Sequence, residues 1–226
     1  MFGTGGREVV CLLNGVAMST RSWYPFVPLL TGERDVLLFD YWGQGKSFSE
    51  DVPYSIPRFA DALAMILDEL GVPLIHLMGI SYGGFVALDF ARQCPQRLHT
   101  LTLSGILLTH EALFEMYEEL SLRFYRSGQI ELYAWYLYEK IFGETFLRQV
   151  GAKLDSMRQK LVERYRDKAY CLIQLTLAQD QLFADLDANL DAYRAIPTPT
   201  LIIAGADDRT IPWRVQKKLC DILPNT

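Results

Sequence analysis

The 226-residue chain has few cysteines, and none of them is spaced as a metal or disulfide site requires. The cysteines are Cys11, Cys94, Cys171 and Cys220. They stand far apart, without a CxxC pair or a Cys/His pattern, which argues against a zinc site and a disulfide framework. We therefore expect no metal and no other cofactor, and a reducing cytoplasm as the location.

The chain also lacks a long apolar run and an excess of positive charge. No apolar run reaches the about 18–20 residues that a membrane span needs, and the opening has no signal-peptide pattern. The formal net charge is -5, so the chain offers no broad basic face to nucleic acid. We expect a soluble protein with a small-molecule partner, without nucleic acid or a membrane span.

Hydrophobic residues make up 50% of the chain, enough for one domain with a substantial core. Continuous apolar runs are typical of strands that are covered on both faces of a parallel sheet. Such runs occupy residues 9–13, 36–39, 74–78, 98–104 and 200–204. Helical patterns lie between them, and Ser55 and Gly71 are expected to begin and end one of these helices. The pattern predicts an α/β fold with a mostly parallel, doubly wound sheet.

A segment of helical periodicity separates the last two apolar runs. It spans residues 107–196, which is too long for a loop. We interpret it as a helical cap inserted into a core of residues 1–106 and 197–226. Most of its many aromatic residues are expected to pack internally, and an insert of this kind also suits the wall of an apolar pocket.

The stretch GISYGG, residues 79–84, places Ser81 where a predicted strand becomes a helix. In that setting G-x-S-x-G predicts a sharp turn that lifts the serine hydroxyl above the sheet edge, with Gly79 and Gly83 leaving room for it. The helix start adds a positive dipole end and the free N–H of Tyr82, both suited to an oxyanion. We predict a nucleophile at Ser81; the alternative is a glycine-rich turn with an incidental serine.

Two other strand ends carry candidate site residues. After the first strand, the turn Asn14-Gly15 allows the N–H of Val16 to point into the site, with Asn14 orienting the turn. The alternative there is an ordinary strand-to-helix turn. After the last strand, LIIAGADDRTIP offers Asp207 and Asp208 as an acid that would orient a histidine, with an Asx turn or helix cap as the alternative.

Taken in order, these motifs resemble those of the α/β-hydrolase superfamily over nearly the whole chain. GISYGG looks like the nucleophile elbow, LLNG stands in place of the His-Gly oxyanion turn, and FDYWGQGKS is similar to the D-x-x-G-x-G-x-S loop. GADDRTIP resembles the acid loop G-x-x-D-x-x-x-P, whose register selects Asp208 over Asp207. The resemblance implies Ser81 as nucleophile, Asp208 as acid, and the Val16 and Tyr82 amides as oxyanion hole.

The chain departs from the family pattern at two points. Asn14 replaces the usual histidine, as it does in meta-cleavage-product hydrolases and in the hydroxyacyl transferase of rhamnolipid biosynthesis. The family also has a catalytic histidine beyond one further strand, whereas this chain stops at Thr226. The chain thus resembles a family member shortened at both ends, and we expect it to be nearly inactive on p-nitrophenyl esters.

The three histidines of the chain are weak substitutes for that base. His76 and His99 lie in predicted strands and are expected to face the core or a helix. His110 follows a strand end, at the rim where the cap begins, and is the rival candidate for the base. The family's strand order also leaves the outer edge of 200–204 open, which predicts self-association into a homo-oligomer.

Three functions stay open at this point. The first is a serine hydrolase that acts on an ester, thioester or related acyl substrate, expected to be apolar, through a Ser81 acyl-enzyme. The second is an acyltransferase that uses the same acyl-enzyme, which an apolar, water-poor lid would favour. The third is a non-catalytic, hydrolase-like binding protein, for which the missing histidine argues.

Overall fold

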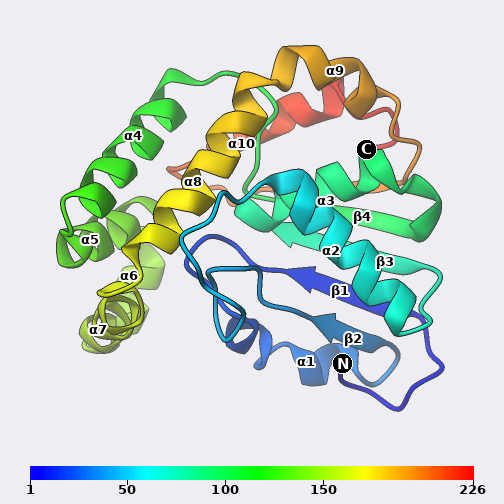
Figure 1. Cartoon of the computed structure of the whole chain (residues 1–226), viewed down its shortest axis with the longest axis horizontal. Coiled ribbons are helices and arrows are strands. Elements are labelled where there is room, and N and C mark those ends of the chain that lie inside the picture. Colours follow the sequence, from blue (N-terminus) through cyan, green and yellow to red (C-terminus); the bar gives the residue numbers. More distant parts are fainter.

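A computed structural model describes residues 1–226, and a parallel sheet lies at its centre (Figure 1). The five strands follow the order β2-β1-β3-β4-β5, and all neighbouring pairs are parallel. Their bounds are β1 (Val9–Leu13), β2 (Asp35–Leu38), β3 (Ile75–Ile80), β4 (Leu98–Ser104) and β5 (Thr200–Ile203). Each strand lies within two residues of its predicted range, so the predicted α/β fold is confirmed.

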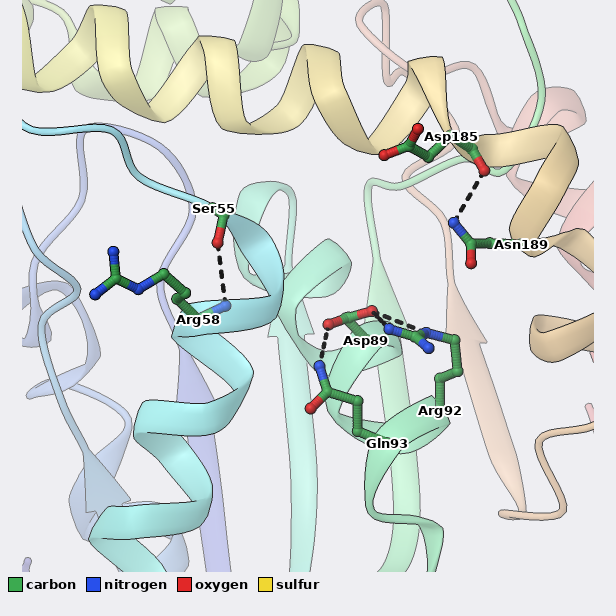
Figure 2. A network of polar contacts seen from close by, with 7 residues as sticks. All are labelled: Ser55, Arg58, Asp89, Arg92, Gln93, Asp185 and Asn189. Atoms are coloured by element: carbon green, nitrogen blue, oxygen red, sulfur yellow. Dashed lines mark hydrogen bonds and ion pairs between the residues drawn. The ribbon is translucent and has the colours of Figure 1, made fainter.

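Helices cover both faces of this sheet, as a doubly wound fold requires. On one face, α2 (Ile56–Glu69) packs beside α3 (Tyr82–Gln93), and their buried side chains join a cluster of 35 buried residues. On the other face, a 3-10 turn (Thr20–Trp23) and the short helix α1 (Val27–Leu30) bury Trp23 against Leu12. Ser55 caps α2 by accepting a hydrogen bond from the Arg58 N–H at 3.3 Å (Figure 2).

Six helices connect β4 to β5, so the helical content predicted for residues 107–196 is observed. They are α4 (Ala112–Arg126), α5 (Ile130–Ile141), α6 (Glu144–Val150), α7 (Lys153–Tyr165), α8 (Ala169–Ala184) and α9 (Leu186–Arg194). Helices α4, α5, α7 and α8 share a second hydrophobic cluster of 12 buried residues. Helix α9 instead packs on α3, and its Leu186 and Tyr193 belong to the main cluster. The division into core and cap at 107 and 196 stays an interpretation.

A buried carboxylate on α3 is satisfied within its own helix (Figure 2). Asp89 is 3% exposed, and its Oδ1 accepts from Arg92 Nη2 at 2.7 Å and Nε at 2.9 Å. Its Oδ2 accepts from Gln93 Nε2 at 2.6 Å. Because both oxygens already have donors, this carboxylate is a structural group of the helix.

The chain ends with short elements beside an open sheet edge. Helix α10 (Trp213–Gln216) follows β5, and short 3-10 segments occupy Pro95–Arg97 and Lys217–Asp221. Strand β5 is one of the two outer strands, as predicted, and Leu201 and Ile203 are 58% and 45% exposed. Self-association through this edge stays a prediction. None of the helices combines the length and apolar character needed to cross a membrane.

Helix α3 approaches β1 so closely that only glycine fits at Gly83. A Cβ atom there would lie 2.6 Å from the carbonyl oxygens of both Leu13 and Asn14. We expect Gly83→Ala to lower the free energy of unfolding by about 2 kcal/mol or more, because the backbones must separate. Urea unfolding followed by circular dichroism measures the change.

The matched control is Gly32→Ala, where an added Cβ has nothing within 4 Å. We expect its free energy of unfolding to change by less than about 1 kcal/mol. Equal losses in the two variants would contradict the role of the close approach.

Candidate functional site

Ser81 occupies a strained turn between β3 and α3, as its motif predicts. Its φ of 49° and ψ of −124° are unusual for a residue with a side chain, and such strain costs about 1–3 kcal/mol. Two backbone hydrogen bonds hold the turn: Ser81 N–H donates to the Ser104 carbonyl at 2.8 Å, and Gly84 N–H donates to the Ser81 carbonyl at 2.7 Å. The exposed hydroxyl makes no capping hydrogen bond, so it is free to meet a substrate.

Two backbone amides beside Ser81 lack acceptors and line the same cavity. Tyr82 is the first residue of α3, so its N–H has no partner within the helix. The N–H of Val16 donates to no backbone carbonyl, while the Gly15 carbonyl accepts from the buried Gln44 Nε2 at 3.1 Å. Because the C=O and N–H of a trans peptide point in opposite directions, this bond turns the Val16 N–H away from Gln44. The arrangement suits a pair of oxyanion donors.

Asn14 lies behind this turn and does not line the cavity. It is fully buried, its Oδ1 accepts from Trp23 Nε1 at 2.9 Å, and its Nδ2 donates to Asp40 Oδ1 at 3.1 Å. Asp40 Oδ1 also accepts from the Thr20 N–H at 2.7 Å. Asn14 is therefore a positioning residue that ties the β1 turn to the loop after β2.

Asp208 and Asp207 differ in their surroundings. Asp208 lines the cavity, and its Oδ1 accepts from the N–H groups of Thr210 at 3.0 Å and Ile211 at 2.9 Å. Asp208 therefore forms the Asx turn that was the alternative to its role as an acid. Asp207 also lines the cavity, but it is exposed and its carboxylate accepts no hydrogen bond from the protein. Gly105 lies between Ser81 and Asp208. A Cβ atom added to Gly105 would be 3.9 Å from both Asp208 Oδ2 and Ser81 N, so the two predicted site residues lie close together.

Gln216 is a site residue that the sequence patterns do not reveal. It is fully buried, and its Nε2 donates to Asp208 Oδ2 at 3.0 Å and to the Ile211 carbonyl at 2.7 Å. Its Oε1 accepts from the Gly105 N–H at 2.9 Å. The side chain therefore fixes the acid loop to the end of β4. A glutamine at the end of a four-residue helix carries no local signal of this role.

None of the histidines lines the cavity that contains Ser81. His110 is half exposed and lines a neighbouring hollow, where its Nδ1 lies 3.5 Å from Glu115 Oε1. The structure therefore does not bring this candidate base to the nucleophile. His76 and His99 stack with ring centroids 5.0 Å apart near the amino ends of β3 and β4, at the edge opposite Ser81.

The expectation that His99 faces the core or a helix is wrong. The pairing of β3 with β4 shifts between Ile75 and His76, whose partners are Leu98 and Thr100, so His99 is the extra residue of a bulge. A bulge interrupts the alternation of side chains across the sheet, and His99 is exposed there.

The cavity over Ser81 has a volume of about 550 Å³ and lies between the sheet edge and the helical segment. Ten of its 23 lining residues are hydrophobic, so its wall is mixed rather than uniformly apolar. Phe85 and Ile211 supply apolar surface near the sheet, and polar side chains of α4, α5 and α8 line the helical side. A substrate here would meet both kinds of surface.

Known proteins resemble the chain along nearly its whole length. A family model described as "alpha/beta hydrolase fold" matches residues 8–226. The "Putative carbamate hydrolase RutD" of Pseudomonas savastanoi pv. phaseolicola is 30% identical over 223 residues, which cover 96% of this chain and 82% of that protein. The protein of the same name from Caulobacter vibrioides is 26% identical over 97% of this chain and 80% of its own length.

Two solved structures share the fold. MGS-M2, an alpha/beta hydrolase enzyme from a Medee basin deep-sea metagenome library, has a TM-score of 0.88 at 24% identity and covers 100% of this chain and 81% of its own. The enol-lactonase from Burkholderia xenovorans LB400 has a TM-score of 0.83 at 20% identity, covering 99% and 83%. At these identities the likeness concerns the fold alone.

The different surroundings of the two aspartates predict different effects of amide substitution. In Asp208→Asn, an NH₂ group must face either backbone N–H groups or the Gln216 donor. We expect the free energy of unfolding to fall by about 1–3 kcal/mol, because a buried donor loses its acceptor. In Asp207→Asn, we expect a change within about 0.5 kcal/mol. Urea unfolding of both variants tests this, and a larger loss in Asp207→Asn would refute it.

Proposed function

Because the chain belongs to the alpha/beta hydrolase fold family, we propose that it hydrolyses an ester, thioester or related acyl substrate through an acyl-enzyme on Ser81. Family membership and the names of its relatives make the chain a hydrolase. The observation that carries the serine mechanism is the strained turn that presents the Ser81 hydroxyl to a cavity of about 550 Å³. Strain of this kind persists where the surrounding structure holds it, and it clusters at functional sites.

In the proposed reaction the Ser81 oxygen attacks the acyl carbonyl carbon. The carbonyl oxygen takes up negative charge, which the N–H groups of Val16 and Tyr82 stabilise as an oxyanion. The leaving group departs with a proton and leaves an ester on Ser81, and water then releases the acid. Asp208 is the proposed acid of the site, and Gln216 positions it.

The proton of the Ser81 hydroxyl has no histidine acceptor in this cavity. General-base assistance is typically worth ~10²–10⁴-fold, so the rate of attack by Ser81 depends on the group that accepts this proton. Labelling of Ser81 tests whether this hydroxyl reacts, because an unreactive serine would not form an adduct.

The relatives named as carbamate hydrolases support carbamates as one member of the proposed substrate class. A carbamate carbonyl is an acyl centre, and a serine hydroxyl attacks it in the same way as an ester carbonyl. The helical segment 107–196 is proposed as the cap that covers the bound substrate, because α4, α5 and α8 contribute to the cavity wall.

A fluorophosphonate probe tests the nucleophile. We expect mass spectrometry to find the adduct on Ser81 in the unaltered protein and no adduct in Ser81→Ala, which loses only an exposed hydroxyl. The matched control is Ser104→Ala, a second serine of the same cavity, which should still be labelled at Ser81. Labelling of Ser81→Ala at the same rate, or an adduct on Ser104, would overturn the assignment.

The position of His110 predicts that it is not the base. The His110 side chain lies in a neighbouring hollow. We therefore expect the rate of Ser81 labelling in His110→Ala to stay within about twofold of the rate in the unaltered protein over pH 6–9. Loss of a general base would lower that rate by ~10²–10⁴-fold. Stopped samples analysed by mass spectrometry give the rates. A loss of labelling by tenfold or more in His110→Ala would show that this imidazole reaches Ser81 after all.

A further inference from the structure

The helical side of the Ser81 cavity holds a cluster of three polar side chains, two of them buried. Glu118 on α4, Lys140 on α5 and Gln179 on α8 all line the cavity (Figure 1 for the helices). Lys140 and Gln179 are each 6% exposed. The Lys140 Nζ lies 3.8 Å from Glu118 Oε1, which is an ion pair without a hydrogen bond. Three different helices thus bring charged and polar groups to one wall.

One donor of this cluster has no acceptor, and a second has only a long ion pair. The Gln179 Nε2 is buried and forms no hydrogen bond, although the amide is close enough to lower the pKa of Glu118. The Lys140 Nζ pairs with the Glu118 carboxylate at 3.8 Å and lies over the faces of Tyr136 at 5.0 Å and Tyr117 at 5.4 Å, which accept no conventional hydrogen bond. Buried donors without acceptors are costly, and the large majority of buried polar groups are paired. The cavity therefore presents open hydrogen-bonding capacity to its occupant.

The charges of the cluster restrict what can fill it. Burial raises the pKa of Glu118, which Lys140 opposes and Asp180 reinforces. Burial also lowers the pKa of Lys140, which Glu118 opposes. A ligand carboxylate would stand beside the Glu118 carboxylate, and a ligand ammonium would leave the Gln179 donor without an acceptor. A neutral group with one acceptor and one donor avoids both problems and adds no buried charge.

We propose that Glu118, Lys140 and Gln179 form a subsite for a primary carboxamide at the end of the substrate remote from the reacting carbonyl. The carboxamide oxygen accepts from Lys140 Nζ and Gln179 Nε2, and its NH₂ group donates to the Glu118 carboxylate. The subsite rests on the proposed function, because it names the substrate class of the Ser81 cavity. It lies across that cavity from the sheet, so it acts in binding and takes no part in bond breaking.

Binding to the Ser81→Ala variant tests the subsite without depending on turnover. The probes are monomethyl esters built on succinic, glutaric and adipic acid. At each chain length, three matched probes carry a carboxamide, a carboxylate or a second methyl ester at the far end. Methyl 5-aminopentanoate adds the ammonium arm. Isothermal titration calorimetry measures the dissociation constants. We expect the carboxamide of at least one chain length to bind about tenfold or more tightly than its dimethyl ester, the size of a charge-assisted hydrogen bond.

Variants in the same background locate the preference. We expect Gln179→Leu and Lys140→Met each to reduce the carboxamide preference by about tenfold. Since Lys140→Met leaves Glu118 without its cation, thermal unfolding checks that the variant is folded, and Gln179→Leu tests the subsite independently. The matched control is Gln174→Leu on the same helix, whose Nε2 donates to Asp51 at 2.8 Å outside the cavity. That control should keep the full preference.

The outcomes separate this inference from the proposed function. Equal binding of carboxamide and dimethyl ester, tighter binding of the carboxylate or ammonium probe, or an unchanged preference in Gln179→Leu would each overturn the subsite. Fluorophosphonate labelling of Ser81 with no carboxamide preference would leave the serine mechanism standing and remove the subsite. A carboxamide preference that Gln179→Leu abolishes, without Ser81 labelling, would support the subsite and remove the serine mechanism.

Discussion

The site depends on the close approach of three backbone segments at the carboxyl edge of the sheet. Gly83 leaves no space for a side chain beside the Leu13 carbonyl, and a Cβ at Gly15 would lie 3.4 Å from Ser81 Cβ. The Ser81 N–H in turn donates to the Ser104 carbonyl. Because β1, β3 and β4 are parallel, their ends meet here, and the glycines let the turns interlock. The packed core beneath the turns therefore balances the strain at Ser81.

Buried amide side chains orient the loops that leave this edge. A loop has no ladder hydrogen bonds, so its polar groups must find other partners. Asn14 joins the β1 turn to Asp40, Gln44 holds the carbonyl that precedes the Val16 amide, and Gln216 joins Asp208 to the end of β4. Each of these amide side chains carries both donors and an acceptor and joins two segments, whereas an ionised carboxylate can only accept. The positions of the proposed oxyanion donor Val16 and of the proposed acid Asp208 both follow from such bridges.

The parts of this arrangement that the sequence predicts are those with a local signal. The strands appear as continuous apolar runs, and the Ser81 turn as a glycine pattern between a strand and a helix. Gln44 and Gln216 could not be found in this way, because a buried glutamine looks like a surface glutamine until its distant partners are known. The exposure of His99 was missed for a related reason, since a bulge depends on the pairing of β3 with β4. The sequence of residues 107–196 predicted aromatic packing but not the meeting of Glu118 with side chains from two other helices.

The acid loop and the end of α5 are joined directly, so the two ends of the cavity are not independent. The Thr210 hydroxyl donates to the Lys140 carbonyl at 3.1 Å, and Arg209 donates to the carbonyls of Glu139 and Phe142. The Thr210 N–H also donates to Asp208 Oδ1. A displacement of α5 would therefore strain the loop that carries the proposed acid Asp208, and a ligand that fixes α5 would restrain the loop. Contacts on the helical side of the cavity thus reach Asp208 through hydrogen bonds within a single loop.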